Sequence, residues 1–379
     1  MSSSCHFLSV ILAATPMLIW AQTPAAVRIR PVINPDALAR PAVPADPLEM
    51  VTDAQSVQDA QQRLGAIGLL ERARGLSNVR AQPYDLKTSF ISWGGLASDG
   101  SWTLEDISAA HMYRWTAQGP NYSATNLYPN GTQNMMYSSQ PGGFVPLRLA
   151  QVREAIFFNY QFPGPQASVR TASGSLNGAP QSCVLVVIGA GERTFSGGRN
   201  WEETEYCVDT SSGLLTTYSP TPGLFVHYDY SSAVMFHGKT IPGSFTITEG
   251  GRNMVEARTI SVTDPPGAQD PMFNPAGLTP MGVGRVMTPA TRIRSFEGVS
   301  SQTAANQNAT LQIVVLHGNL SPDGHLGETE ILASTDPSLN QAALERANRI
   351  MAGPGQRQPG ATPQSREVFF TLEFMKQGQ

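Results

Sequence analysis

Charged residues are scarce in this sequence. They make up 14% of its 379 residues, whereas a typical soluble domain contains roughly 25%. The net charge is −4, the two signs are interspersed, and no basic run is present. A nucleic-acid-binding surface needs clustered lysine and arginine, so we do not expect nucleic acid as a partner.

A long apolar run is also missing. Residues 7–20 form an apolar core of about 14 residues, fewer than the roughly 20 that span a membrane. This length is typical of a secretory signal peptide. We therefore expect residues 1–21 to be cleaved and the protein to be exported to the periplasm. Residues 1–6 contain no Lys or Arg, which leaves an uncleaved N-terminal anchor as the alternative.

Cysteine is nearly absent. Once residues 1–21 are removed, only Cys183 and Cys207 remain. An even number of cysteines in an exported protein predicts a disulfide. A metal-binding pair is the weaker alternative, because neither a second CxxC motif nor clustered histidines accompany them.

Glycine and proline are abundant, with 35 and 29 residues, and hydrophobic residues reach 41%. This composition favours buried cores built from many short strands joined by turns, and the length suggests two domains. We divide the chain into a Pro/Ala-rich tether (22–50), a helical segment (51–80), a β-rich domain (83–264), a linker (265–300) and a C-terminal module (301–379).

The helical segment has apolar residues at steps of three or four, which predicts one buried face. That face contains Val57, Ala60, Leu64, Ile67 and Leu70.

The β-rich domain alternates short apolar stretches with turn residues such as Asp99-Gly100, Asn130-Gly131 and Gly250-Gly251. No strand–helix–strand alternation is present, so we expect an antiparallel sheet, interrupted by a helix at Leu147–Phe157. The predicted strands are Asp85–Trp93, Ser101–Ala109, Met112–Gln118, Tyr122–Tyr128, Asn134–Tyr137, Cys183–Ile188, Glu203–Val208, Leu214–Ser219, Leu224–Met235, Lys239–Glu249 and Met254–Thr263.

The C-terminal module shows two strands, Leu311–Leu316 and Leu326–Ala333, joined by a turn at Asp323-Gly324. A helix follows from Asp336 or Pro337 to Met351, and Glu367–Met375 is the last strand. The order of these elements, with Leu339-Asn340-Gln341-Ala342-Ala343-Leu344 opening the helix, resembles the TonB C-terminal domain family over residues 305–376. The resemblance implies a ββαβ module that contacts envelope proteins.

One helix does not close the edges of such a sheet, which predicts partner binding by strand addition. We expect the terminal strand to be the open edge, with Phe369, Thr371 and Glu373 facing outward. The alternative is that this edge docks on the chain's own β-rich domain.

Residues 83–264 resemble, at the level of the fold, the half-barrel of LolA/LolB-like lipoprotein carriers. The resemblance rests on the order of residues 206–215, His227-Tyr228-Asp229-Tyr230 and Ile241-Pro242. It implies a mainly β, half-barrel-like sheet that could hold a lipid or acyl chain. The candidate cavity lining is Trp93, Trp102, Trp115, Phe225, Tyr228 and Tyr230, and the alternative is that these aromatics form the sheet core.

Several motifs could carry chemistry, but none is complete. The glycine-rich segment 189–197 follows a strand yet precedes no helix signal, so a long hairpin is expected rather than a phosphate site. His227, Asp229 and His237 could approach a metal site, but no further ligand is evident. Glu202, Glu203 and Glu205 are expected on a solvated strand face. We therefore expect no catalytic residues, no cofactor and no metal.

Together these patterns predict a non-enzymatic envelope protein that acts by binding another protein through its C-terminal module. The alternative is a carrier that holds an apolar ligand in the half-barrel.

Overall fold

The computed structural model describes most of the β-rich domain and the C-terminal module. The predicted signal peptide and tether lie outside the described residues, as do Asn130-Gly131, Gly250-Gly251 and the segment 189–197. The described ranges are 54–93, 99–129, 135–140, 145–157, 167–187, 203–221, 224–249, 252–281, 293–297, 309–334, 336–349 and 366–377.

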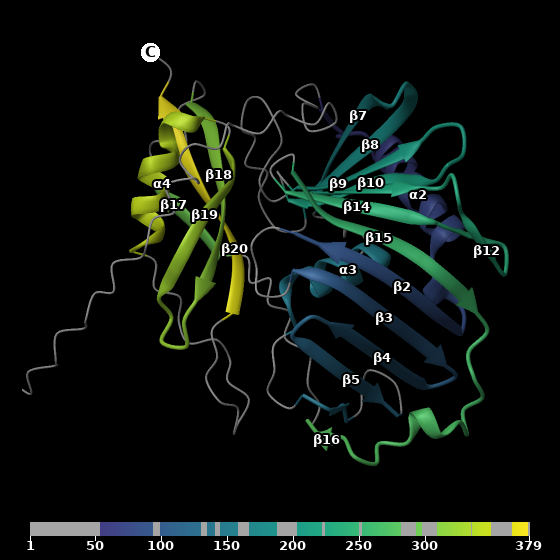
Figure 1. Cartoon of the computed structure of the whole chain (residues 1–379). Coiled ribbons are helices and arrows are strands. Elements are labelled where there is room, and N and C mark those ends of the chain that lie inside the picture. The colour runs from purple at the N-terminus through teal and green to yellow at the C-terminus, as the bar shows by residue number, and fades with distance from the viewer. Residues whose placement is uncertain are drawn as a thin grey trace, which may run out of the picture. The chain divides into compact units, whose positions relative to one another are not determined.

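A large antiparallel sheet dominates the fold (Figure 1), which confirms the predicted class. The order of its strands is β1-β7-β8-β9-β10-β11-β14-β15-β2-β3-β4-β5-β6-β16, so the sheet has two ends. In chain order its strands are β1 (Gln55–Ser56), β2 (Tyr84–Ser92), β3 (Gly100–Ala109), β4 (Met112–Gly119), β5 (Tyr122–Tyr128), β6 (Tyr137–Ser138), β7 (Ser168–Leu176), β8 (Ala179–Val187), β9 (Thr204–Asp209), β10 (Leu215–Thr221), β11 (Leu224–Asp229), β14 (Ser244–Glu249), β15 (Arg252–Thr263) and β16 (Thr279–Pro280).

The main core lies between this sheet and the two helices α2 (Ala60–Ser77) and α3 (Leu147–Phe157). Alternation along the strands creates it: in β2, Phe90 is buried in this core while its neighbour Ile91 is 44% exposed. The short 3-10 helices η1 (Val79–Ala81) and η2 (Pro271–Phe273) complete this part of the chain.

The predicted buried face of the helical segment is only partly correct: Val57 and Leu70 are buried, whereas Ala60 and Leu64 of helix α2 are exposed. The N-cap of α2, Asp59, accepts a hydrogen bond from the Gln62 amide at 2.8 Å. The buried residues are Ala66, Leu70 and Ala73, whereas Leu64 is 63% exposed. The small alanine side chains let the helix approach the sheet closely, so the packed stripe is rotated away from Leu64.

The predicted strand Leu224–Met235 is two strands. β11 ends at Asp229, whose Oδ1 accepts a hydrogen bond from the Ser231 amide at 2.8 Å and so turns the chain. After this turn, β12 (Val234–Phe236) and β13 (Lys239–Ile241) form a separate hairpin. The predicted strand Lys239–Glu249 is likewise divided into β13 and β14.

The predicted linker 265–300 is not a linker throughout, because parts of it are packed. Phe273 is buried against Ile107 and Leu127, and β16 pairs with β6. Strand β17 (Ile293–Glu297) belongs to the C-terminal sheet.

The C-terminal sheet has the order β17-β20-β18-β19 (Figure 1). Its remaining elements are β18 (Ala309–Leu320), β19 (Leu326–Ser334), the 3-10 helix η4 (Pro337–Leu339), α4 (Asn340–Ala347) and β20 (Arg366–Gln377). The predicted ββαβ order is confirmed. The module has its own core, in which Ala343, Leu344 and Ala347 of α4 pack on the sheet residues Val314 and Leu372.

No helix in the described ranges is both long enough and apolar enough to cross a membrane.

Candidate functional site

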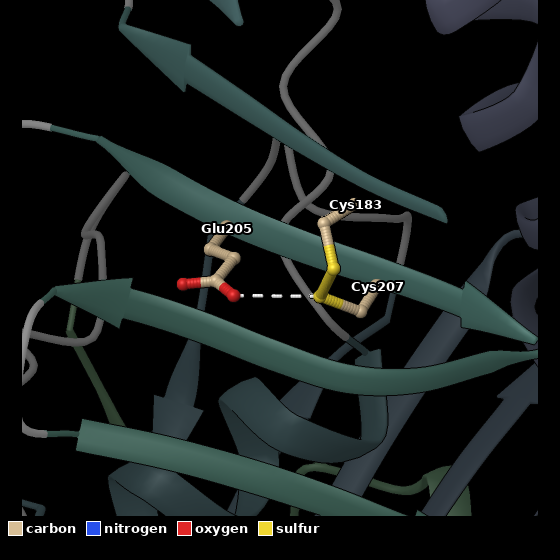
Figure 2. A group of neighbouring side chains, drawn as sticks. All are labelled: Cys183, Glu205 and Cys207. Carbon is tan, nitrogen blue, oxygen red and sulfur yellow. Dashed lines mark hydrogen bonds between the residues drawn. A yellow bond between two sulfur atoms is a disulfide. The ribbon is translucent and has the colours of Figure 1, made fainter. Parts of the chain in front are cut away.

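The two cysteines form the most distinctive group of side chains in the large sheet. Cys183 on β8 lies directly opposite Cys207 on β9, and the two are joined by a disulfide (Figure 2). Both residues are fully buried. The predicted disulfide is therefore confirmed, and its place in the sheet follows from the pairing of two neighbouring strands.

A carboxyl group lies beside this disulfide. Glu205 precedes Cys207 by two residues on β9, so both side chains are on the same face of the sheet. Glu205 Oε1 is 3.4 Å from Cys207 Sγ (Figure 2). Histidine, cysteine, aspartate and glutamate side chains carry atoms that can bind a metal. Within the described residues, only Cys183, Glu205 and Cys207 bring three such atoms within 4.8 Å of one another.

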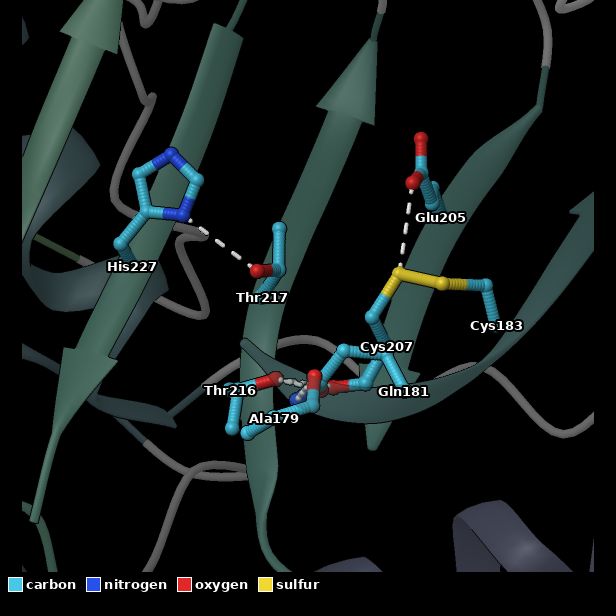
Figure 3. Close-up of a disulfide and its surroundings, with 8 residues drawn as sticks. All are labelled: Ala179, Gln181, Cys183, Glu205, Cys207, Thr216, Thr217 and His227. Carbon is cyan, nitrogen blue, oxygen red and sulfur yellow. Dashed lines mark hydrogen bonds between the residues drawn. A yellow bond between two sulfur atoms is a disulfide. The ribbon is translucent and has the colours of Figure 1, made fainter. Parts of the chain in front are cut away.

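The row of paired residues continues across the sheet from Cys207. Thr217 on β10 pairs with Cys207 on one side and with His227 on β11 on the other (Figure 3). The Thr217 hydroxyl lies 3.3 Å from His227 Nδ1. Next to this row, the Thr216 hydroxyl donates to the Gln181 side-chain oxygen at 2.5 Å, which ties β10 to β8.

The predicted solvated face of glutamates is wrong for the two that the structure describes. Glu203 is 1% exposed and Glu205 is fully buried. Arg170 on β7 reaches Glu203 with its Nη1 3.0 Å from Oε1, and this ion pair accounts for the burial of Glu203. The two-residue spacing of Glu205 and Cys207 within a predicted strand was the signal that could have placed this carboxyl beside the disulfide.

The histidines weighed as metal ligands do not meet. His227 is in the row described above, and His237 lies in the β12–β13 turn, where its Nε2 is 2.6 Å from Asp264 Oδ1. Asp229 instead accepts hydrogen bonds from Ser231.

A second buried polar group lies between α3 and the sheet, around Asp106. The hydroxyls of Tyr84 and Tyr113 donate to its two carboxylate oxygens at 2.7 and 2.6 Å. Arg153 of α3 donates to the Tyr113 hydroxyl at 2.6 Å and lies over the Trp115 ring at 4.2 Å. Burial raises the pKa of Asp106, and Arg153 and the two tyrosines partly offset this.

Other polar contacts also hold α3 to the sheet. The Tyr218 hydroxyl donates to Glu154 Oε1 at 2.8 Å, and the Tyr228 hydroxyl donates to the Ala155 carbonyl at 2.6 Å. At the start of the helix, Arg148 and Gln151 both donate to Glu249. Sequence reasoning missed these groups, because residues distant in sequence meet only in the folded sheet.

The six aromatics of the predicted cavity do not share one lining. Trp102, Trp115 and Tyr228 are buried in the main core, with half-buried Tyr230 packed against it. Phe225 lies outside that core and stacks on the His227 ring with centroids 6.0 Å apart. Trp93 is 41% exposed. Trp102, Trp115 and Tyr228 thus belong to the main core, as the alternative interpretation held, and Phe225 is also buried, with 2% of its surface exposed.

The predicted open edge of the C-terminal module is also wrong. Phe369, Thr371 and Glu373 belong to β20, which lies between β17 and β18 in the sheet. Strand β18 pairs with β20 along its whole length, and β17 pairs with it from Phe370 to Phe374, so Thr371 and Glu373 have a neighbouring strand on both sides. The prediction failed because β17 lies in the segment assigned to the linker.

Comparison with known proteins gives little more. No protein-family model matches the chain, and no curated protein matches its sequence. The resemblance to the TonB C-terminal family therefore gains no support. The crystal structure of the LolA superfamily protein NE2245 from Nitrosomonas europaea aligns with a TM-score of 0.37 and 9% identity, over 53% of this chain and 94% of that chain. Similarity this weak implies no function.

Proposed function

We propose that the chain is a non-enzymatic protein of the bacterial cell envelope that recruits a partner protein by strand addition at β19. The supporting observation is the order of the C-terminal sheet, in which β19 is an outermost strand. Within the described residues β19 pairs with β18 alone, and it is nine residues long. An outer strand of this length presents unpaired N–H and C=O groups that an extended peptide can pair with.

The composition of β19 restricts the partner. Its sequence includes Glu328 and Glu330. Opposite charges on neighbouring strands stabilise pairing, and like charges oppose it. The partner strand therefore carries lysine or arginine, and pairing of β19 with a second copy of itself is disfavoured.

Photo-crosslinking in cells tests this proposal. A photo-crosslinking amino acid replaces Glu328 or Glu330 on β19, and as a control it replaces exposed Gln61 on α2. We expect the same adduct from both β19 positions and not from the control. Adducts that are absent from β19, or that are identical at all three positions, contradict strand addition at this edge.

Two observations support the proposed location in the cell envelope. Residues 7–20 have the length of a signal-peptide core, and disulfides such as Cys183–Cys207 persist in oxidising compartments. The test is the mass of the protein isolated from the periplasm. Its N-terminus should follow Ala21, and a mature chain that begins at Met1 contradicts cleavage.

A second candidate function is an apolar-ligand carrier, favoured by the aromatic surface on which α3 packs. Trp102, Trp115 and Tyr228 are all on that face of the sheet. A ligand there must displace α3. Mass spectrometry of lipids extracted from natively purified protein tests this, and the absence of any stoichiometric lipid contradicts the carrier.

A further inference from the structure

We propose that in the reduced chain Cys183, Glu205 and Cys207 bind one Zn²⁺ ion. This inference is independent of strand addition at β19, because it concerns the other sheet. Its basis is the placement of two sulfur atoms and a carboxylate oxygen within 4.8 Å of one another. Two thiolates and one carboxylate are a donor set that suits Zn²⁺, and three protein ligands leave a fourth position for water.

One distance within the group, between Glu205 Oε1 and Cys207 Sγ, already suits tetrahedral zinc, whereas the two sulfurs are bonded to each other and must separate after reduction. With Zn–S near 2.3 Å and Zn–O near 2.1 Å, neighbouring sulfur and oxygen ligands lie about 3.6 Å apart, and two sulfurs about 3.8 Å. Glu205 Oε1 is already 3.4 Å from Cys207 Sγ. The Cα atoms of the two cysteines are 4.1 Å apart, so rotation about their Cα–Cβ bonds is enough to place both sulfurs around one ion.

The contact between the Glu205 carboxyl and Cys207 Sγ is more favourable when the cysteines are reduced than when they form the disulfide. A disulfide sulfur has no proton, so in the oxidised pair a carboxylate oxygen faces another electron-rich atom. After reduction the Cys207 thiol can donate to Glu205, and after its deprotonation both atoms can bind the same cation. The position of Glu205 is thus favourable in the thiol and metal-bound forms.

Reduction of the Cys183–Cys207 disulfide requires two electrons and two protons, which a dithiol can supply. The dithiol supplies two electrons and two protons, becomes a disulfide itself, and leaves Cys183 and Cys207 as thiols. Binding of Zn²⁺ then releases both thiol protons as the two Zn–S bonds form. Because all three residues are fully buried, the metal enters as the reduced chain folds rather than through a finished surface.

The test compares full-length chain refolded with Co²⁺, as a spectroscopic substitute for Zn²⁺, under reducing and oxidising conditions. We expect one equivalent of Co²⁺ with a thiolate-to-metal charge-transfer band in the reduced protein, displaced by Zn²⁺, and no such band in the oxidised protein. Glu205→Gln should weaken binding by about 10-fold or more, since even outer-shell changes cost that much. Glu256→Gln, at an exposed position on β15, is the matched control and should bind like the wild type.

Thiol protection gives a second measurement. Zn²⁺ should shield Cys183 and Cys207 of the reduced chain from alkylation, and the same reduced chain without Zn²⁺ is the control. Absence of the charge-transfer band in reduced, folded protein overturns the proposal. So does an unchanged affinity in Glu205→Gln, which keeps both cysteines and so can still form the disulfide and fold.

Discussion

Arg148 and Glu249, which are 101 residues apart in the sequence, form a buried ion pair with Nη1 and Oε1 2.5 Å apart. Their side chains are only 2% and 1% exposed. The pair joins the start of α3 to the end of β14, and Gln151 donates to the same carboxylate oxygen at 2.6 Å.

Removal of one partner from this pair should be strongly destabilising. Glu249→Gln leaves the Arg148 guanidinium buried without its counter-charge, which costs about 3–5 kcal/mol in the free energy of unfolding. Urea denaturation measures the loss. Glu105, which forms more exposed ion pairs with Lys87 and Arg114, is the control, and Glu105→Gln should cost about 1 kcal/mol or less. A double change, Arg148→Met with Glu249→Leu, should recover much of the loss, and additive losses would argue against direct coupling.

The disulfide should contribute measurably to stability. Cys183 and Cys207 are separated by 24 positions, and closing a loop of this length contributes roughly 3 kcal/mol in the chain-entropy model. The variant Cys183→Ser with Cys207→Ser should lose about that much in denaturant unfolding. Thiol labelling of unreduced, unfolded mature protein should find no free thiol, and two labelled cysteines would refute the bond.

Asp209 should make stability depend on pH in the acid range. The Ser211 hydroxyl, followed by the Ser212 amide, lowers the pKa of Asp209 to about 2, against an ordinary value of 3.8. A depressed pKa in the folded state means that this stabilisation is present above 3.8 and is lost as the pH falls through about 2. Asp209→Ala should therefore be destabilising near neutral pH and nearly neutral at about pH 2, as measured by unfolding at both values. A cost that is independent of pH contradicts the assignment.

Gly119 should not tolerate a side chain. A Cβ at this position overlaps the ring of Trp102, which is 2% exposed and stacked on Phe90. Gly119→Ala should lower the free energy of unfolding by about 1–3 kcal/mol or more through overpacking. The contrasting variant is Gly65→Ala in α2, where nothing lies within 4 Å, and there helix propensity should raise stability by up to about 1 kcal/mol. Thermal unfolding followed by tryptophan fluorescence compares the two, and equal effects would contradict the packing argument.

The strands with regular alternation could be predicted from the sequence, and so could the helix α3. The predicted helix Leu147–Phe157 and the predicted strand Tyr122–Tyr128 have the same bounds as α3 and β5. Strand β7 was missed because Ser168–Leu176 is mostly polar, although Asn177-Gly178 after it is a strong hairpin signal. The positive φ values of both residues, 50° and 82°, show that this turn forms.

The disulfide could be predicted from the count of cysteines alone, and the two-residue spacing places Glu205 on the same strand face as Cys207, but the burial of that face could not be predicted. Burial of Glu205 depends on which face of β9 is covered, and strand periodicity identifies a face without saying what lies over it. The same limit applies to β17, since its parallel pairing with β20 joins two segments that are distant in the sequence.

The strands at the two ends of the large sheet determine which N-terminal residues a truncated protein should keep. Its outermost strands, β1 and β16, are only two residues long. Next to β1, the Val57 amide donates to the Val169 carbonyl at 2.9 Å, so β1 and Val57 together cover one end of β7. A fragment that begins at Gln58 or later lacks this cover and exposes the backbone of β7.

Such a fragment should then aggregate through edge-to-edge association of its sheets, even if its core folds normally. Purified domains for structural work should therefore begin upstream of Ala54.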